Sequence, residues 1–302
     1  MLIGLFYLRA LNMRQDIDAD YIHKLNKKFH DQEEAYNYDS RMGAMYDYES
    51  QQQTIKELES VLGHALPKGG TVVDVASGTG NLAVKLAATN WYKQVIAVDI
   101  SERSLDVAHQ NAHKMQTTIK TITSDMTILP FDDNSVDLVV GCAFLHHLPD
   151  PKTFMQEVLR ILKPGGEFII IGEPTTHGGQ LIEIIKAPLV WINNLRRYFF
   201  NQRQQQMRWD HANIDVHDFN QQDAEQLLRG FNTPKIITEG FLSPIVDQGL
   251  MTPIRSTLSE KSRIKPIFVS INRGLAWCDT TIFNAIIPKF WRVSLKLSGE
   301  KP

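Results

Sequence analysis

The sequence predicts an α/β protein built on a mostly parallel β-sheet that is doubly wound, with helices on both faces. From about residue 71, short runs rich in valine and isoleucine alternate with segments of helical spacing. The apolar runs are continuous rather than alternating, as is typical of strands that are covered on both faces. Strand–helix–strand order of this kind implies parallel pairing with right-handed crossovers.

The expected elements follow one another along the chain. Five strands are expected before residue 175, at 71–76, 95–100, 118–125, 135–143 and 167–173. Helices are expected at 81–88, 101–114, 150–162 and 218–230, and Ser101 is a good N-cap for the second of them. Two more runs, 234–241 and 265–273, are expected to be strands six and seven. Pro266 suits the start of a strand or a sheet edge.

The strand-forming parts divide the chain into five regions. Residues 175–217 lack strand signals and are rich in aromatic residues and arginine, so we expect a helical insertion, or lid, over the carboxyl edge of the sheet. The expected regions are an N-terminal helical extension (1–60), the first part of the sheet (61–174), the lid (175–217), the last helix and strands (218–274) and a C-terminal extension (275–302).

The composition is that of a globular protein with a sizeable core: 302 residues, 43% apolar and 22% charged. Two cysteines, Cys142 and Cys278, form neither a disulfide framework nor a cysteine-rich zinc site, and they indicate a reducing, cytoplasmic setting. The net charge of −2 gives no support for nucleic-acid binding. Residues 1–185 hold 24 acidic and 16 basic residues, whereas 186–302 hold 10 and 16, so the two halves are suited to different partners.

The first 13 residues are apolar, with Arg9 interrupting them. No basic residue precedes the apolar run and no clear cleavage site follows it. We therefore interpret this segment as a disordered or surface-lying lead-in rather than a signal peptide, with Met13 as an alternative start. Elsewhere the sequence has no stretch approaching the roughly 18 uncharged apolar residues of a membrane-spanning helix.

A small-residue loop, V-D-V-A-S-G-T-G at 73–80, follows the first expected strand. Ligands of open α/β sheets bind beyond the carboxyl ends of the strands. Gly78 and Gly80 allow the backbone to approach a ligand, and the next helix offers its N–H groups to an anion. Asp74, in contrast, favours a nearby cation. A ligand with both a carboxylate and an ammonium group would use both features, and the methionine end of S-adenosylmethionine is such a ligand.

A dinucleotide site is the alternative interpretation of this loop. G-T-G-N-L-A at 78–83 matches the loose pattern G-x-G-x-x-A, and Asp99 lies near the spacing expected for a ribose-binding acid. Asp74 counts against it, because a carboxylate there would repel a pyrophosphate. A nicotinamide-dependent oxidoreductase therefore stays open as a second function.

Two further acids follow the next strands. Asp99 ends the second strand and can accept hydrogen bonds from both ribose hydroxyls. Asp125 follows the third strand and can accept a hydrogen bond from an adenine amino group. Together they fit one adenosine along the sheet edge, although each is also a common turn or cap residue.

Five blocks at this spacing resemble the class I S-adenosylmethionine-dependent methyltransferases of the type 11 kind. They cover roughly 71–174 and read V-V-D-V-A-S-G-T-G, V-I-A-V-D-I-S, S-D-M-T-I-L-P-F-D-D-N-S-V-D-L-V-V, F-L-H-H-L-P-D-P and V-L-R-I-L-K-P-G-G-E-F-I-I-I-G-E-P. The resemblance implies a Rossmann-like, seven-stranded sheet whose last strand is antiparallel, and S-adenosylmethionine as the cofactor, with S-adenosylhomocysteine as its product.

The resemblance also implies roles for individual residues. Asp74, Gly78 and Gly80 would hold the methionine part, and Asp99 the ribose. Ile100 and Met126 would flank the adenine, Asp125 would bind its amino group, and Cys142 would line the methyl end. Ala76 stands in the cofactor loop where the family usually has glycine, and a positive φ there would strain the loop.

The segment F-H-D-Q-E-E-A-Y-N-Y-D-S-R at 29–41 resembles the lead-in helix of the family, whose aromatic residue closes over the cofactor. Tyr38 is the expected aromatic residue. The alternative is that Tyr36, Tyr38, Tyr46 and Tyr48 form an amphipathic packing set.

Methyl transfer needs a general base only when the acceptor must lose a proton. The candidates are the histidines near the expected site or in the insertion: His146, His147, His177, His211 and His217. His146 is the preferred base, although the His146–His147 pair also suits a scaffold role. Only His109 and His113 have the helical spacing of a metal pair, and they lie away from the site, so no metal is expected.

Residues 181–209 combine five cations with aromatic side chains, and 277–291 are again aromatic and basic. The first segment fits a cap with its own small core, a pocket for an aromatic, quinone-like or acyl compound, a membrane-surface helix, or an RNA contact. The second fits a part of the lid or a homodimer contact. The sequence favours O- or C-methylation of a small molecule, with a catalytically degenerate cofactor-binding protein as a third function.

Overall fold

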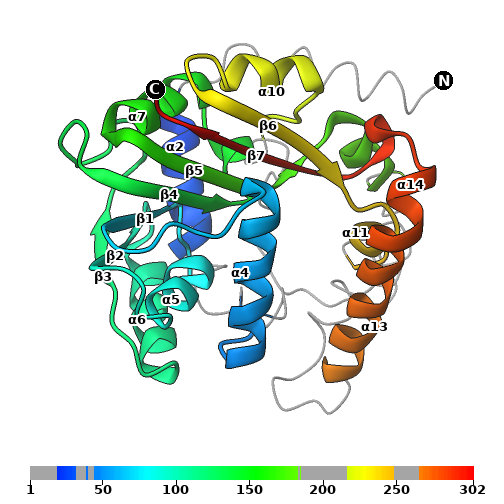
Figure 1. Ribbon diagram of the computed structural model, residues 1–302, viewed down its shortest axis with the longest axis horizontal. Coiled ribbons are helices and arrows are strands. Elements are labelled where there is room, and N and C mark those ends of the chain that lie inside the picture. The colour runs from blue at the N-terminus through cyan, green and yellow to red at the C-terminus, as the bar shows by residue number, and fades with distance from the viewer. Residues whose placement is uncertain (1–18, 32–38, 40–43, 183, 185–215, 248–264) are drawn as a thin grey trace, which may run out of the picture.

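The computed structural model describes residues 19–31, 39, 44–182, 184, 216–247 and 265–302 (Figure 1). Its centre is one seven-stranded sheet in the order β3-β2-β1-β4-β5-β7-β6. The strands are β1 (Thr71–Val75), β2 (Gln94–Asp99), β3 (Lys120–Thr123), β4 (Val136–Cys142), β5 (Leu162–Pro174), β6 (Asn232–Glu239) and β7 (Ser294–Glu300).

The first five strands are parallel to one another, and β7 runs antiparallel between β5 and β6. The parallel register aligns Asp74 of β1 with Ala97 of β2, and Asp99 of β2 with Thr123 of β3. The carboxyl ends of β1, β2 and β3 therefore meet at one edge of the sheet. The predicted α/β, mostly parallel sheet with an antiparallel last strand is confirmed.

Helices cover both faces of the sheet. The helices of the described residues include α2 (Ala19–Phe29), α4 (Tyr48–Leu62), α5 (Asn81–Ala87), α6 (Glu102–Lys114), η3 (Leu145–His147), α7 (Pro151–Ile161), α10 (Gln221–Leu227), α11 (Leu242–Val246), α13 (Lys265–Cys278), η5 (Asp279–Phe283), α14 (Asn284–Ile286) and η6 (Lys289–Trp291). Ser101 caps α6 as expected, because its Oγ accepts a hydrogen bond from Ser104 N at 3.1 Å.

Two apolar cores lie on opposite faces of the sheet. One packs α4, α5 and α6 against alternate strand residues such as Val72, and the other packs α7 and α10 against the residues between them, such as Val73. Both valines have an exposed fraction of 0%. This explains why the strand sequences are continuous apolar runs: most positions of the central strands β1 and β4 are buried against one layer of helices or the other.

The prediction of strand seven at 265–273 is wrong, because these residues begin helix α13, which continues to Cys278. Pro266 is the second residue of that helix, a position that tolerates proline because the first helical N–H groups need no helical partner. The seventh strand is instead β7, within the predicted C-terminal extension.

The buried lysine of β7 accounts for the missed strand. Lys296 interrupts the apolar pattern, but it is 4% exposed and forms ion pairs with Glu57 of α4, at 2.8 Å, and with Glu239 of β6. Two carboxylates from neighbouring elements stabilise a cation at a position where a lone charge would be excluded. Those partners lie far away in the sequence, so the local pattern does not indicate a strand.

The other predicted regions are described in part. Helices α2 and α4 occur within 1–60. Most of the predicted lid, including His211, lies outside the described residues, and so does Tyr38 of the predicted N-terminal extension. The division into five regions otherwise stays a prediction. No helix of the described ranges has the length and apolar character needed to cross a bilayer.

Candidate active site

Asp74 lies at the centre of the candidate site, near the end of β1. It is 1% exposed, and its Oδ2 accepts hydrogen bonds from Ser77 Oγ at 2.6 Å and from Ala83 N at 2.9 Å. Burial, and to a smaller extent the negative charge of Asp99, raises the pKa of Asp74 to about 7, against the opposing effect of these two hydrogen bonds. A cationic ligand group nearby would favour the ionised form.

The loop after Asp74 has a left-handed backbone at three positions. Gly78 and Gly80 have φ of 53° and 85°. A Cβ on Gly80 would lie 2.9 Å from both Ala108 Cβ and Val84 Cγ2, so glycine is needed for the loop to pack on α6. A Cβ on Gly78 would meet no described atom within 4 Å, which leaves the backbone open to a ligand.

Ala76 also has a positive φ, of 49°. The strain expected for a non-glycine residue at this position is therefore present, at a cost of about 1 kcal/mol. Ser77, the next residue, stabilises the turn: its N donates to Val98 O at 2.9 Å and its Oγ donates to Asp74. The loop holds its shape despite the alanine.

Asp99 joins this loop to the loop after β2. Its Oδ2 accepts from Gly78 N at 2.7 Å and its Oδ1 accepts from Ser101 N at 2.8 Å. Burial raises the pKa of Asp99 above its ordinary value, partly opposed by the charge of His30. Each carboxylate oxygen has a second lone pair, so the side chain can still accept hydrogen bonds from ribose hydroxyls. The next residue, Ile100, is half-buried, and its carbonyl accepts from Lys27 Nζ at 3.1 Å.

Asp125 is the most exposed of the three acids, with 54% of its side chain accessible. Its Oδ1 accepts from Thr127 N at 3.0 Å, and its Oδ2 lies 3.9 Å from His23 Nδ1 of α2. Met126 is buried, with φ of 66°. Asp125 thus makes the turn contact that was the alternative for it, and its contact with adenine stays a prediction.

Two aspartates that precede α4, Asp31 and Asp39, are hydrogen-bonded to these loops, and no sequence pattern predicted it. Asp39 accepts hydrogen bonds from Thr79 Oγ1 at 2.5 Å, Asn111 Nδ2 at 2.7 Å and Tyr46 OH at 3.2 Å. Asp31 accepts from Ser101 Oγ at 2.6 Å. These contacts join positions up to 72 residues apart, and no short motif encodes them. They bring the chain on both sides of Tyr38 to the carboxyl edge of the sheet.

His146 lies in η3, just beyond β4, and is oriented by Glu173 at the end of β5. Its Nδ1 is 2.9 Å from Glu173 Oε2. Glu173 is 0% exposed and also accepts from the backbone N of Phe144, Leu145 and His146, at 2.8, 2.9 and 3.2 Å.

Burial alone would raise the pKa of Glu173, but the hydrogen bonds and charge of His146, with the backbone donors, hold it below its ordinary value. Glu173 was not among the predicted site residues. The available signal was an acid that ends a buried strand, G-E-P, as Asp74 and Asp99 do near the ends of theirs.

Of the other candidate histidines, some lie beside His146 and Glu173 and one lies elsewhere in the molecule. The His147 ring lies 3.9 Å from that of His146, and His217 N donates to His146 O at 3.2 Å. His177 instead packs against Trp291, with ring centroids 6.2 Å apart. Burial raises the pKa of the Cys142 thiol to about 12, which favours the neutral thiol over the nucleophilic thiolate; its place at the methyl end stays a prediction.

The structure separates the helical histidine pair from the site. His109, on α6, contacts Thr121 Oγ1 at 3.1 Å. Within the described part of the chain, no three His, Cys, Asp or Glu residues are placed to hold a metal ion.

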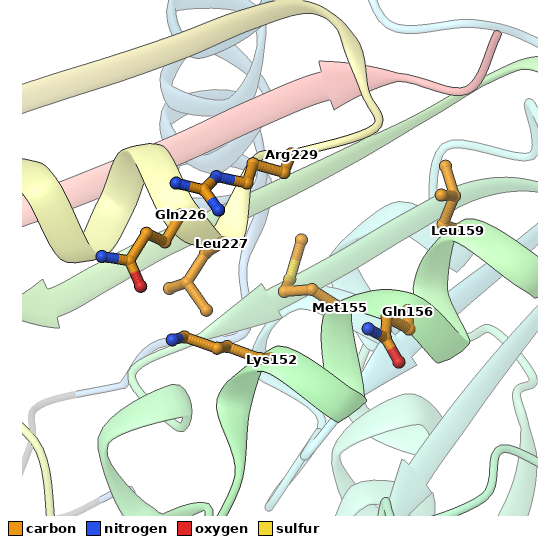
Figure 2. A pocket seen from close by; sticks show the side chains of 7 residues that line it. All are labelled: Lys152, Met155, Gln156, Leu159, Gln226, Leu227 and Arg229. Atoms are coloured by element: carbon orange, nitrogen blue, oxygen red, sulfur yellow. The ribbon is translucent and has the colours of Figure 1, made fainter.

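A cavity of about 210 Å³ lies elsewhere, between α7 and α10 (Figure 2). Its lining combines apolar and polar side chains: Lys152, Met155, Gln156, Leu159, Gln226, Leu227 and Arg229. None of them is one of the three acids, Asp74, Asp99 and Asp125, or a member of the His146–Glu173 pair. The cavity is therefore separate from the candidate site.

Comparisons with known proteins identify the domain. Residues 73–170 match the family model described as a methyltransferase domain. An uncharacterized chloroplastic methyltransferase of Arabidopsis thaliana is 36% identical over 107 residues, covering 34% of this chain and 30% of that protein. The demethylmenaquinone methyltransferase of Clavibacter sepedonicus is 36% identical over 102 residues, covering 34% and 40%. The match thus spans less than half the length of either relative.

Among solved structures, phosphoethanolamine N-methyltransferase 2 of Haemonchus contortus, in complex with S-adenosyl-L-methionine, is similar with a TM-score of 0.58. The two sequences are 17% identical, and the alignment covers 91% of this chain and 60% of that one. This likeness shows a shared fold. The family match identifies residues 73–170 as a methyltransferase domain.

Proposed function

We propose that the protein transfers a methyl group from S-adenosylmethionine to a small hydrophobic or aromatic acceptor. The observation that carries the proposal is the row of acids at the carboxyl edge of three adjacent strands: Asp74 lies one residue before the end of β1, Asp99 ends β2 and Asp125 follows β3. In that order, the three acids would match the cationic amino group, the ribose and the adenine of S-adenosylmethionine. The family match of 73–170 supports the same cofactor.

The bound cofactor supplies an activated methyl group on a positively charged sulfur. Asp74 would attract its ammonium group, and the open backbone of Gly78 would approach its carboxylate next to the start of α5. Asp99 would hold the ribose between the loops it already joins. Because the leaving group is good, the protein acts mainly by aligning donor and acceptor for an in-line displacement and by excluding water.

The His146–Glu173 pair supplies the base if the acceptor must lose a proton. When Nδ1 donates its proton to Glu173, the other ring nitrogen, Nε2, is the one that can accept a proton. Glu173 stabilises the imidazolium that forms. This arrangement suits O-methylation of a hydroxyl or C-methylation of an electron-rich ring, each of which releases a proton.

A quinone-like or other aromatic acceptor is the acceptor class we favour, because the matched relatives include enzymes named for demethylmenaquinone. The nicotinamide alternative is disfavoured, because a buried carboxyl at Asp74 would face a pyrophosphate. The strained Ala76 is the one observation that favours the third function, a cofactor-binding protein without catalysis.

The first test is calorimetric titration with S-adenosylhomocysteine and, separately, with NADH. We expect binding of the first only. Asp99→Ala should weaken it at least about tenfold, because the ribose hydroxyls lose charge-assisted partners. Asp106→Ala, which removes an exposed acid on α6, is the matched control and should bind normally. NADH binding, or unchanged affinity in Asp99→Ala, would contradict the proposal.

The second test separates catalysis from binding alone. A cell extract is incubated with the protein and methyl-labelled S-adenosylmethionine, and the label is fractionated into protein, nucleic acid and lipid-soluble small molecules. We expect protein-dependent label in the last fraction. Cofactor binding without any transfer would instead support the third function.

A further inference from the structure

The exposed large apolar side chains of the described residues are concentrated in one segment. Six of them lie between 267 and 291, each 42–69% exposed. We call this group the C-terminal apolar face; it consists of Ile267, Ile271, Trp277, Ile282, Ile286 and Trp291. Single exposed apolar residues are ordinary on a protein surface, but a contiguous group marks an interaction site.

The segment that carries the face is one run of helical turns. Helix α13, the π-helical turn η5 and α14 follow one another without a break from Lys265 to Ile286. Ile267 and Ile271 are one turn apart, as are Ile282 and Ile286 near the other end. Figure 1 shows α13 and α14 at the side of the molecule opposite β3. The apolar residues are thus presented along a rod at the periphery of the fold.

The orientation of this rod is fixed by Asp279, which is 2% exposed. Its carboxylate accepts hydrogen bonds from Leu242 N and Ser243 N, both at 2.8 Å, and from Ser243 Oγ at 2.5 Å. These donors cap the start of α11, which packs against α13. Asp279 thus holds one side of the rod against α11, and the six exposed residues of the C-terminal apolar face lie on the surface that remains accessible.

The charge of residues 265–292 indicates which kind of partner suits the C-terminal apolar face. Residues 265–292 contain four basic residues and a single acid, and that acid is the buried Asp279. The exposed surface around the apolar face therefore has no carboxylate from this segment. A second copy docked face to face would bring two sets of cations together, which is unfavourable. A surface that is apolar inside and negatively charged at its boundary fits the segment better.

We propose that the C-terminal apolar face docks on the surface of an anionic phospholipid bilayer, with the isoleucines and tryptophans in the interfacial region and the exposed Lys289 at the headgroups. Tryptophan favours this depth, and basic side chains beside an apolar face are typical of interfacial helices. The inference is independent of the proposed function, but it would place the enzyme where hydrophobic acceptors dissolve.

The test is flotation of the full chain with vesicles. One set is phosphatidylcholine alone, and the other is one part phosphatidylserine to two parts phosphatidylcholine. We expect binding to the anionic set at least about tenfold stronger than to the neutral set, and weaker binding as salt is added. Absence of binding to the anionic vesicles would overturn the proposal.

The variant is the double substitution Ile271→Glu with Trp277→Glu, and the matched control is Ile128→Glu, an exposed isoleucine outside this segment. The double variant should lose at least about tenfold in vesicle binding, and the control should bind normally. Circular dichroism and thermal unfolding establish that both are folded. Equal losses in both variants would contradict the proposal.

Sedimentation without vesicles tests whether a second copy of the chain covers the C-terminal apolar face instead. A monomeric wild type supports the membrane assignment. A dimer that the double variant abolishes would show that the face joins two copies of the chain, and would overturn it.

Discussion

At the scale of single residues, the candidate site depends on a carboxyl group held at an energetic cost. Asp74 has only two hydrogen-bond donors in a buried position, so burial dominates and its pKa is about 7. In an unfolded chain the same group has its ordinary pKa of about 4. The folded protein without ligand therefore gains stability from the protonated form and loses it as the pH rises through about 7.

The first prediction concerns Asp74→Asn. Because the amide stays neutral, we expect the free energy of unfolding above pH 7 to rise by about 2 kcal/mol, with little change near pH 4. Binding of S-adenosylhomocysteine should weaken at least about tenfold, because the ammonium loses its counter-charge. Urea unfolding and calorimetry measure the two effects.

The same group makes cofactor binding pH-dependent in the wild type. Below about pH 7, Asp74 must give up its proton for the ammonium to bind, so affinity should fall by up to about tenfold per pH unit. Asp74→Asn should lose that dependence and Asp106→Asn should keep it. A wild-type affinity that is flat from about pH 6 to 8 would mean that Asp74 is not the partner of the ammonium.

The second prediction concerns Ala76. Its φ of 49° is the left-handed region, where glycine has no Cβ penalty. Ala76→Gly should therefore raise the free energy of unfolding by about 1 kcal/mol. Ala88→Gly is the matched control: its φ is −67°, so glycine there should destabilise by about 0.5–1 kcal/mol. If both substitutions destabilise equally, the strain at Ala76 is absent.

At the scale of elements, Glu173 determines how β5 and η3 meet. Its carboxylate accepts four hydrogen bonds from η3 and the residue before it. The turn that carries the histidines is therefore positioned by β5, whose part in this the sequence around the histidines does not predict. The pKa of Glu173 is depressed in the folded state, despite burial. Its contribution to stability is therefore present above its unfolded pKa and is lost as the pH falls through the folded value.

The third prediction separates the two members of this pair. Glu173→Gln should destabilise the fold by about 2–4 kcal/mol, because its amide NH₂ faces backbone donors. His146→Asn should leave the fold and the cofactor Kd unchanged but lower kcat by about 10²–10⁴-fold if the acceptor is deprotonated. His109→Asn, on α6, is the control. Unchanged kcat in His146→Asn would assign the histidine turn a scaffold role only.

Sequence reasoning succeeded where local order determines the structure. The strand–loop–helix succession places Asp74, the glycines and Asp99 directly, since each lies within a few residues of the turn it serves. It failed where partners are distant. Glu173 and His146 are 27 residues apart, and Asp39 and Asn111 are 72 apart. The wrong prediction of a strand at α13 has the same cause. The true strand, β7, contains Lys296, which can be buried there only because it pairs with the distant Glu57 and Glu239.

At the scale of the whole molecule, the last residues of the chain complete the sheet. β7 pairs antiparallel with both β5 and β6, so β6 has no other strand partner in the described sheet. Leu295 and Leu297 of β7 also belong to the core that contains α7 and α10. Asp74, Asp99 and Asp125 lie at strands β1 to β3, on the other side of the sheet from β6 and β7.

The last prediction follows from that topology. A chain ending at Val293 lacks β7, which leaves β6 unpaired and exposes the core against which Leu295 and Leu297 pack. Since β5 then becomes an exposed edge next to an unattached β6, we expect loss of cooperative urea unfolding and of the near-ultraviolet circular dichroism signal, with aggregation. Removal of Pro302 alone, which lies beyond β7, is the control and should leave both unchanged. A cooperative, soluble protein ending at Val293 would show that the five parallel strands fold without the C-terminal strand. Calorimetry with S-adenosylhomocysteine would then establish whether the acidic edge still binds its ligand.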